Sequence, residues 1–208
     1  MFPSINQIQI NEQADITFAT GLKSILRQDP DVILVGEVRD VETARIAVQS
    51  ALTGHFVLSS IHATDSSSAL YRLVDMGIEP FLVASSIVGV VAQRLVRRIC
   101  EGCRESFHPS SADLFFYEQL GGTPRDVWYH GAGCNLCAGS GYRDRIGAFE
   151  VMTMSDEVRH MVVAGGTPQQ LRGLAIEQGM QPLRSEALRL VTEGITTIAE
   201  IIRTVYVV

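Results

Sequence analysis

The chain has 208 residues, of which 46% are hydrophobic and 19% charged, a composition typical of a soluble globular protein with one large core or two modest domains. The formal charge of −6 at pH 7 argues against a broad nucleic-acid-binding surface. The longest apolar run, Phe81–Ala92, is interrupted by polar residues and is shorter than the roughly 20 residues that a membrane span needs. No charged-then-apolar leader opens the chain, so the cytoplasm is the expected compartment.

The first segments predict a strand and a helix. Over Ile5–Ile10, isoleucines alternate with polar residues, which is typical of a half-exposed strand. Apolar residues then recur at helical spacing over 18–26. Thr17 is the expected N-cap, and Pro30 is expected to stop the helix.

A strand, a helix and a second strand are predicted next. The apolar run Val32–Val35 indicates a strand buried on both faces of a parallel sheet. Asp40 is the expected N-cap of a helix that ends at Gly54. The segment His55–His62 then reads as the second strand. Because the helix connects the two strands, they should be parallel and close neighbours.

Charged and polar side chains follow the ends of these two strands. Glu37 and Arg39 come directly after the first strand, and His62 ends the second. Ligands of open parallel sheets bind beyond the carboxyl ends of the strands. Glu37 is therefore placed to meet phosphate, metal or water, and His62 to contact a phosphate, whereas His55 should be a structural histidine at the opposite edge. A charged loop that only caps a strand is the alternative.

The rest of the chain is predicted to be mainly helical. A helix capped by Thr64 or Asp65 should end at Gly77, and another should run over 80–93. A strand is expected over 145–151. Three helices follow, over 168–179, over 182–194 and after Thr197; the first and last begin with capping-box spacings, and none carries a catalytic constellation.

All four cysteines fall in two C-x-x-C pairs, Cys100/Cys103 and Cys134/Cys137. In a chain without an export signal, this spacing indicates a structural Zn²⁺ held by four thiolates. A redox disulfide and a site that has lost its metal are the alternatives. The arginines that flank both pairs are expected either to offset the thiolate charge or to form a solvated basic face.

Five collinear segments carry a family resemblance: GLKSILRQDPD from Gly21, GEVRD from Gly36, SALTGHFVLSSIHATD from Ser50, AQRLVRRIC from Ala92, and GYRDRIGAFEV from Gly141. Together with the paired cysteines they resemble the bacterial secretion ATPases, the traffic ATPases of type II secretion and type IV pilus assembly. By position, GEVRD corresponds to the Walker B segment of that family, and residues 54–62 correspond to its histidine box.

The resemblance implies an α/β fold with three parts. Residues 1–98 would form part of a RecA-like P-loop NTPase core with a parallel sheet, residues 99–142 an inserted four-cysteine zinc subdomain, and residues 143–208 a mostly helical C-terminal subdomain. The zinc subdomain is typical of assembly and secretion members and is lacking in the retraction ATPases. This favours pilus assembly or secretion over retraction.

The resemblance also implies cofactors, roles and partners for the full-length enzyme, with ATP and Mg²⁺ as cofactors. Glu37 would polarise the attacking water or hold it against Mg²⁺, and His62 would report the γ-phosphate. Arg39 is a catalytic candidate that, with Arg27 and Arg94, would stabilise charge or contact another subunit. The implied partners are five further copies in a homo-hexamer and inner-membrane platform proteins at the cytoplasmic face, with membrane association through those partners and no nucleic acid.

One family motif is missing from the chain. A P-loop requires G-x-x-x-x-G-K-[ST], and the only lysine, Lys23, lies inside a predicted helix. We expect the P-loop upstream of Met1, so that these residues are the C-terminal part of the enzyme and neither bind ATP tightly nor hydrolyse it alone. A zinc-ribbon binding module and a ring paralogue that does not hydrolyse ATP are the other readings.

Overall fold

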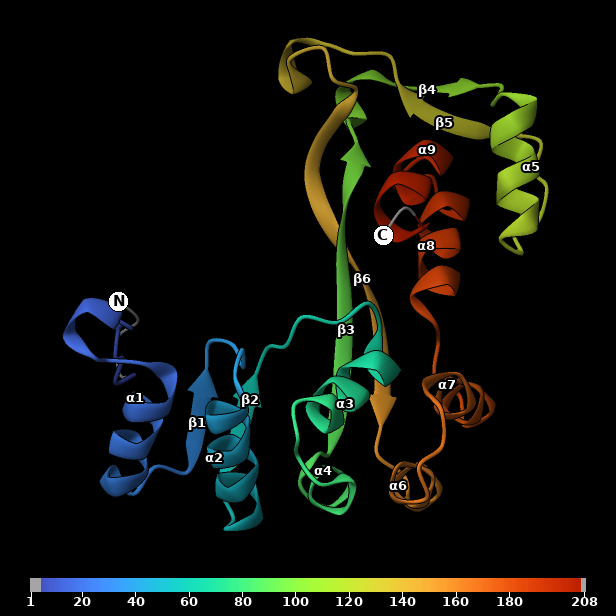
Figure 1. The fold of residues 1–208 in the computed structure, drawn as a ribbon. Coiled ribbons are helices and arrows are strands. Elements are labelled where there is room, and N and C mark those ends of the chain that lie inside the picture. Colours follow the sequence, from blue (N-terminus) through green and yellow to red (C-terminus); the bar gives the residue numbers. More distant parts are fainter. Residues whose placement is uncertain (1–4, 207–208) are drawn as a thin grey trace. The chain divides into compact units, whose positions relative to one another are not determined.

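The computed structural model describes residues 5–206 and divides the chain into two compact units (Figure 1). The first unit comprises the described residues up to Ala63 together with Ser67–Val90 and Thr153–Ala175. The second comprises Thr64–Ser66, Val91–Met152 and the described residues from Ile176 onward. The division into 1–98, 99–142 and 143–208 stays a prediction about segments of the sequence.

The first unit contains a parallel pair of strands and most of the short helices. Its elements, wholly or mainly, are η1 (Glu12–Ala14), α1 (Phe18–Ile25), η2 (Leu26–Gln28), β1 (Val32–Val35), α2 (Val41–Leu52), β2 (Phe56–Ser59), α3 (Ser66–Asp75), α4 (Pro80–Ser86), α6 (Asp156–Val163) and α7 (Pro168–Glu177). The predicted parallel pairing is confirmed, with Val32 opposite Phe56 and Val35 opposite Ser59. This part of the chain is therefore α/β.

Helices α1 and α2 cover one face of the β1–β2 sheet. Leu22 of α1, Ala47 of α2 and Ile33 of β1 belong to one buried cluster. The other face carries Leu34, 71% exposed, and Phe56, 53% exposed. The prediction that β1 is buried on both faces is therefore wrong, because no other element of residues 5–206 covers this second face.

The strand predicted over Ile5–Ile10 is also absent. These residues have no regular structure, and the Ile5 side chain is 62% exposed. A strand needs a partner for its backbone groups, and in the described part of the chain only an isolated bridge between Asn11 and Ile16 forms nearby. The alternation of apolar and polar residues indicates which side chains would share one face of a strand. It does not provide the neighbouring strand that a sheet requires.

The local signals for helix ends were more reliable. The Thr20 amide donates to Thr17 Oγ1 at 3.2 Å at the start of α1, and the Thr43 amide donates to Asp40 Oδ1 at 2.8 Å at the start of α2. After α2 the chain turns at Gly54, whose φ of +105° favours glycine. Both predicted N-caps are thus confirmed.

The second unit is built on a long two-stranded ribbon. Its elements are β3 (Gly89–Ile99), η3 (Glu101–Cys103), β4 (Arg104–Phe107), α5 (Ser111–Gln119), β5 (Trp128–Gly131), η4 (Asn135–Cys137), β6 (Tyr142–Thr153), α8 (Leu183–Thr192), α9 (Ile198–Ile201) and the π-helical turn η5 (Ile202–Tyr206). Strands β3 and β6 pair with each other and run in opposite directions, and β4 pairs antiparallel with β5 (Figure 1).

The helix predicted over residues 80–93 is only half right. Helix α4 ends at Ser86, and β3 begins at Gly89. The residues between Ile87 and Val91 are mainly β-branched, which favours a strand once a partner is available, and β6 is that partner. The strand predicted over 145–151 is confirmed as the middle of the longer β6.

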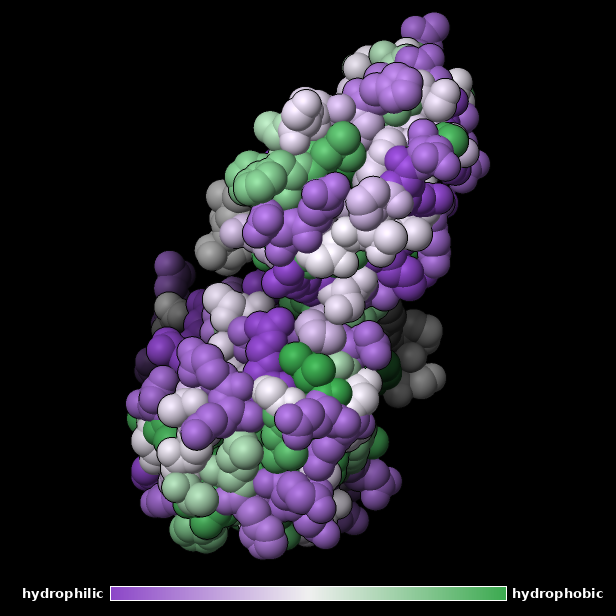
Figure 2. Space-filling model, turned by 90° about the vertical axis from the view of Figure 1, so that its right-hand side faces the viewer, coloured by the Kyte–Doolittle hydropathy of each residue, from purple (hydrophilic) through white to green (hydrophobic). Residues whose placement is uncertain are grey.

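The C-terminal helices form the core of the second unit together with the hairpin segment. Tyr117 of α5 meets Trp128 of β5 edge-on, with ring centroids 4.9 Å apart, and both pack against Val191 of α8 and Ile201 of α9. On the face of the molecule shown in Figure 2, hydrophobic residues form small green groups among polar ones. Among residues 5–206, no helix is long and apolar enough to cross a bilayer.

A buried carboxylate holds α9 to the ribbon. Glu200, whose side chain is 0% exposed, accepts from the Arg97 guanidinium at 2.6 Å and from Arg203 at 2.7 Å. Arg97 also lies over the Tyr142 ring, 4.1 Å from its centroid. Burial raises the pKa of Glu200, but the hydrogen bonds from Arg203 and Arg97 outweigh it and lower this pKa to about 2.

We expect this carboxylate to make folding stability depend on pH. Because the folded-state pKa lies below the ordinary 4.5, the stabilisation is complete above about pH 5 and is lost as the pH falls towards 2. Glu200→Gln should lower the free energy of unfolding at pH 7 by about 3 kcal/mol, and the variant should lose less stability than the parent on acidification. Urea unfolding at several pH values measures both effects. Glu118→Gln, an exposed change on α5, is the control, and equal acid sensitivity of parent and Glu200→Gln would contradict the assignment.

Candidate functional site

The segments that follow β1 and β2 stay paired beyond the ends of the strands. The Val38 amide donates to the Ser60 carbonyl oxygen at 2.9 Å, and the Ser60 hydroxyl donates to the Gly36 carbonyl oxygen at 2.8 Å. This pairing aligns the residues after the two strands. Glu37 and His62 consequently meet at the carboxyl edge of the sheet, as their positions in the sequence predicted.

Glu37 is the centre of this edge. Its Oε1 lies 2.6 Å from Arg39 Nη2, and its Oε2 lies 3.5 Å from His62 Nε2. The Glu37 side chain is 22% exposed, whereas that of His62 is 92% exposed. The hydrogen bond from Arg39 is the largest influence on the pKa of Glu37 and lowers it from the ordinary value. The carboxylate is therefore ionised near neutral pH and remains accessible from solvent.

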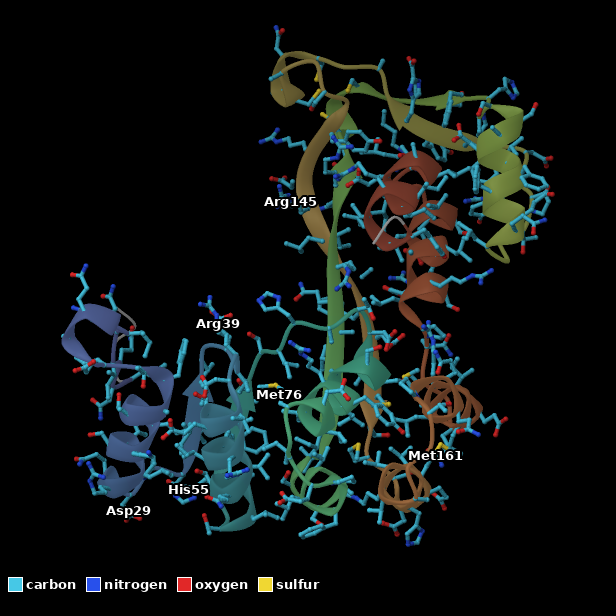
Figure 3. All side chains as sticks on the ribbon, in the orientation of Figure 1. Asp29, Arg39, His55, Met76, Arg145 and Met161 are labelled. Carbon is cyan, nitrogen blue, oxygen red and sulfur yellow. The ribbon has the colours of Figure 1, made fainter. Side chains whose placement is uncertain are left out.

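The two histidines of this region lie at opposite ends of the sheet. Figure 3 shows Arg39 at one end of β1 and β2 and His55 at the other. Nδ1 of His55 lies 3.0 Å from the Ser50 carbonyl oxygen and 3.2 Å from Thr53 Oγ1, at the end of α2. These contacts fit a structural role for His55.

Only one of the three candidate arginines lies beside Glu37 in the first unit. Arg27 is in η2, which leads into the start of β1, so it lies at the end of the strand away from Glu37. Arg94 belongs to the second unit, where it donates to the Thr64 carbonyl oxygen at 2.8 Å. The geometry of the first unit therefore groups Glu37, Arg39 and His62.

The chemistry open to this group follows from its donor and acceptor atoms. Carboxylate oxygens suit Mg²⁺ or a water that must be oriented, and an exposed imidazole can donate to a phosphate oxygen. The chain places a carboxylate and an imidazole on one edge, with Glu37 Oε2 3.5 Å from His62 Nε2. It does not contain the glycine-rich loop that would wrap the phosphates of a nucleotide.

The second candidate site is the cysteine cluster, and a hairpin assembles it. Cys103 immediately precedes β4, Cys134 follows β5, and Arg104 pairs with Gly131 in the β4–β5 register. The Ala132 amide donates to the Cys103 carbonyl oxygen at 2.9 Å and continues this ladder towards the cysteines. The long stretch between the pairs is thus a hairpin containing α5.

The four sulfur atoms have the spacing of a tetrahedral metal site. Cys100 Sγ lies 3.9 Å from Cys134 Sγ, while Cys137 Sγ lies 3.8 Å from both Cys103 Sγ and Cys134 Sγ. All four lie within 4.8 Å of one another. Four sulfurs at ~2.3 Å from a central Zn²⁺ would be about 3.8 Å apart, whereas a disulfide needs ~2.05 Å. The donor set and its geometry therefore fit a divalent metal ion.

Backbone amides support the thiolate form of this cluster. The Gly133 amide donates to Cys103 Sγ at 3.3 Å, and the Cys134 amide donates to Cys137 Sγ at 3.2 Å. Donation from Cys134 lowers the pKa of the Cys137 thiol to about 6, whereas burial raises the pKa of the Cys103 thiol to about 12. Some of the thiols would therefore release protons on metal binding.

The arginines near the cysteines contact other groups. Arg97 pairs with Glu200, and Arg98 lies 3.5 Å from Glu101. Arg104 lies over the Tyr129 ring at 4.0 Å. These contacts give the three side chains partners other than the thiolates. Their closeness to the cysteines in the sequence therefore did not identify the groups that they contact.

Sequence reasoning missed one buried polar cluster, formed by Glu150 and Ser66. Both residues are 0% exposed, and the Ser66 amide donates to Glu150 Oε1 at 3.0 Å. A single carboxylate inside an otherwise apolar strand segment, Ala148–Met152, was the available signal.

Comparison with known proteins gives consistent sequence matches. Residues 2–203 match a family model described as "Type II/IV secretion system protein". The chain is 47% identical over 201 residues to "Type II secretion system protein HxcR" of Pseudomonas aeruginosa, an alignment that covers 97% of the chain and 39% of that relative. It is 43% identical over 204 residues to "Type IV pilus assembly ATPase PilB" of Thermus thermophilus, covering 96% of the chain and 23% of that relative. The chain thus spans less than half of the length of either curated relative.

Solved structures share the fold at lower sequence identity. One described as "Crystal Structure of the Pilus Retraction Motor PilT and Bound ADP" has a TM-score of 0.62 and 22% identity, over 90% of this chain and 43% of that one. The ATPase DotB of Legionella pneumophila gives a TM-score of 0.61 at 22% identity, over 88% of this chain and 41% of its own. At this identity the likeness concerns the fold alone.

We expect the pKa of Glu37 to depend on Arg39. Arg39→Gln should raise this pKa, because it removes the charged donor at 2.6 Å, and His62→Ala should raise it less. Carbon-detected NMR titration of the glutamate carboxyl groups measures the shift. Arg45→Gln, an exposed change on α2, is the matched control, and an unchanged Glu37 pKa in Arg39→Gln would contradict the pairing.

Proposed function

The chain belongs to the type II/IV secretion system protein family, as its motifs implied, and from this membership we propose that it forms part of an ATPase that drives type II secretion or type IV pilus assembly. The single observation that carries the proposal is the meeting of Glu37 and His62 at the carboxyl edge of a parallel sheet, in a chain of this family. The working protein would be a homo-hexamer on inner-membrane platform proteins at the cytoplasmic face.

Assembly or secretion fits the chain better than retraction. The four sulfurs form a compact cluster, and the resemblance ties a four-cysteine subdomain to assembly and secretion members. The curated relatives with 43% and 47% identity carry pilus-assembly and secretion names. The likeness to the retraction motor is one of fold at 22% identity and does not oppose this reading.

In the proposed reaction, Glu37 orients the attacking water or holds it against Mg²⁺, which would neutralise phosphate charge when bound. The lowered pKa keeps Glu37 ionised for this task, and Arg39 keeps the carboxylate directed along the edge. His62, 92% exposed, is free to turn from Glu37 towards a γ-phosphate oxygen. Positioning and charge stabilisation of this kind are the main sources of catalysis in phosphoryl transfer.

The phosphate-binding loop must come from elsewhere in the complete protein, because G-x-x-x-x-G-K-[ST] does not occur in these 208 residues. We therefore propose ATP hydrolysis for the complete protein, and we expect this polypeptide alone to be inactive. A ring paralogue that does not hydrolyse ATP would share this fold. It would differ in the turnover experiment below, because its complete protein would release no phosphate.

We further propose that the four cysteines hold a structural Zn²⁺. All four ligands are thiolates, which leaves no open coordination position for catalysis. The sulfur spacings of 3.8 to 3.9 Å and the amide donors to Cys103 and Cys137 support this assignment. The ion would close the hairpin that links the two cysteine pairs.

The catalytic assignment predicts a clear mutant phenotype. In the complete protein, Glu37→Gln should lower the ATP turnover number by at least ~100-fold while leaving nucleotide bound, because the amide cannot accept a proton or polarise water equally well. Turnover is measured by phosphate release and binding by a fluorescent nucleotide. Glu42→Gln is the control, since Glu42 is an exposed carboxylate whose partner is Lys23, at 2.6 Å. Normal turnover in Glu37→Gln would remove Glu37 from the chemistry.

The zinc assignment predicts loss of metal on substitution of one ligand. Cys134→Ser should abolish stoichiometric zinc and lower the thermal midpoint of unfolding, because three ligands and a weak fourth hold the ion poorly. Elemental analysis and calorimetry measure the two effects. Ser106→Ala, an exposed change on the same hairpin, should retain zinc. Native melting in a metal-free Cys134→Ser protein would show that the cluster does not stabilise the fold.

A further inference from the structure

Ser60 makes hydrogen bonds on both sides of Glu37. The Ser60 hydroxyl donates to the Gly36 carbonyl oxygen at 2.8 Å, and the Ser60 carbonyl oxygen accepts from the Val38 amide at 2.9 Å. Gly36 and Val38 are the chain neighbours of Glu37. All four residues belong to the first unit, so these contacts lie within one compact part of the chain. Ser60 therefore holds the backbone immediately before and after Glu37.

The pairing of the two strands shifts by one residue at Glu37. Continued by one residue, the register of β1 with β2 places Gly36 opposite Ser60. In a regular parallel ladder of this register, the Glu37 amide would donate to the Ser60 carbonyl oxygen. The Val38 amide donates instead. Glu37 is therefore an extra residue on its side of the pair, as in a β-bulge, a feature that re-aims a side chain.

The Ser60 hydroxyl adds a restraint that the backbone alone does not provide. A carbonyl oxygen that accepts from Val38 is present with any residue at position 60, whereas the bond to the Gly36 carbonyl oxygen requires a side-chain donor. Ser60→Ala would leave this oxygen to water, since Gly36 and Ser60 are both exposed. A water molecule satisfies the oxygen but does not tie it to the end of β2.

Packing from α1 holds the same part of the backbone. A methyl group on Gly36 would lie only 3.3 Å from Cε1 of Phe18 and 3.6 Å from its Cζ, so the Phe18 ring lies close against the backbone of Gly36. Phe18 packs in turn against the buried cluster that contains Leu22 and Ile33. The carbonyl oxygen that accepts from the Ser60 hydroxyl therefore belongs to a residue that α1 also restrains.

The side-chain partners of Glu37 are themselves exposed. Arg39, 2.6 Å from the carboxylate, and His62, 3.5 Å from it, have side chains that are 64% and 92% exposed. Ion pairs between exposed side chains are weak, because holding both in one geometry costs side-chain entropy. The direction of the Glu37 carboxylate thus depends strongly on where the backbone of residues 36–38 places the side chain.

We propose that Ser60 is a positioning residue for Glu37. Its hydroxyl holds the Gly36 carbonyl oxygen and its carbonyl oxygen holds the Val38 amide, which fixes the backbone on either side of the carboxylate that orients the attacking water. Ser60 touches no reacting atom in this scheme and acts through the backbone. The inference rests on the proposed function, because it takes Glu37 to act on a water molecule in ATP hydrolysis.

The test uses the complete protein and two substitutions at position 60. Ser60→Ala removes the hydroxyl, and Ser60→Thr keeps one. Ser85→Ala is the matched control, because Ser85 is also an exposed serine of the first unit, and its hydroxyl donates to the Phe81 carbonyl oxygen at 2.7 Å. Hydrogen exchange of peptides covering 35–40 measures the restraint on the backbone. Steady-state ATP hydrolysis gives kcat and KM, and calorimetry gives the melting temperature.

In Ser60→Ala we expect faster amide exchange over 35–40 and a kcat about 10-fold lower, because a small misplacement of a catalytic group costs much of its effect. KM for ATP should change little, since Glu37 acts on water rather than on nucleotide binding. The melting temperature should also change little, because water can replace the hydroxyl at the exposed Gly36. Ser60→Thr should restore both the exchange and kcat, and Ser85→Ala should keep the parent values.

The proposal is overturned by unchanged exchange over 35–40 in Ser60→Ala, by faster exchange with unchanged kcat, by a Ser60→Thr protein as slow as Ser60→Ala, or by an equal loss of kcat in Ser85→Ala. A complete protein that hydrolyses no ATP before any substitution would instead refute the proposed function. The exchange comparison would then still decide whether the Ser60 hydroxyl holds the backbone around Glu37, because it needs no activity.

Discussion

The second unit depends on the burial of two carboxyl groups that must be supplied with hydrogen-bond donors. Glu150 and Glu200 are 0% and 1% exposed, and a carboxyl group without water is tolerated only where donors surround it. The donors come from distant segments: Ser66 is 84 residues from Glu150, and Arg97 is 103 residues from Glu200. Each carboxylate therefore fixes the ribbon against an element that the chain reaches much earlier or later.

The sequence predicted the candidate edge because its determinants are local. The β1–α2–β2 unit has a strong cap at Asp40, a left-handed turn at Gly54 and a crossover that permits parallel pairing only. Once the strands are parallel, residues after their carboxyl ends must meet, and Glu37 and His62 do so at 3.5 Å. Their catalytic roles stay a prediction, because proximity does not reveal what they bind.

The missed elements depend on partners that no short window contains. Ile5–Ile10 has strand alternation without a partner strand in the described part of the chain, whereas 89–93, predicted as helix, becomes strand because it pairs with β6, which the chain reaches about fifty residues later. The cysteine spacing predicted that the pairs would meet, but only the register of Arg104 with Gly131 explains how. Glu150 could be recognised in the sequence as a charged residue in an apolar strand. Its hydrogen-bond donors, the Ser66 and Leu183 amides, could not be predicted, because they come from distant parts of the chain.

The two candidate sites belong to different units of the chain. All four cysteines belong to the second unit, while Glu37, Arg39 and His62 belong to the first. The covalent links between the units are single backbone connections, and the one closest to the candidate edge is at Ala63 and Thr64. The cysteine cluster and the edge are therefore separate in their chemistry, because the cluster is assembled from residues of the second unit and the edge from residues of the first.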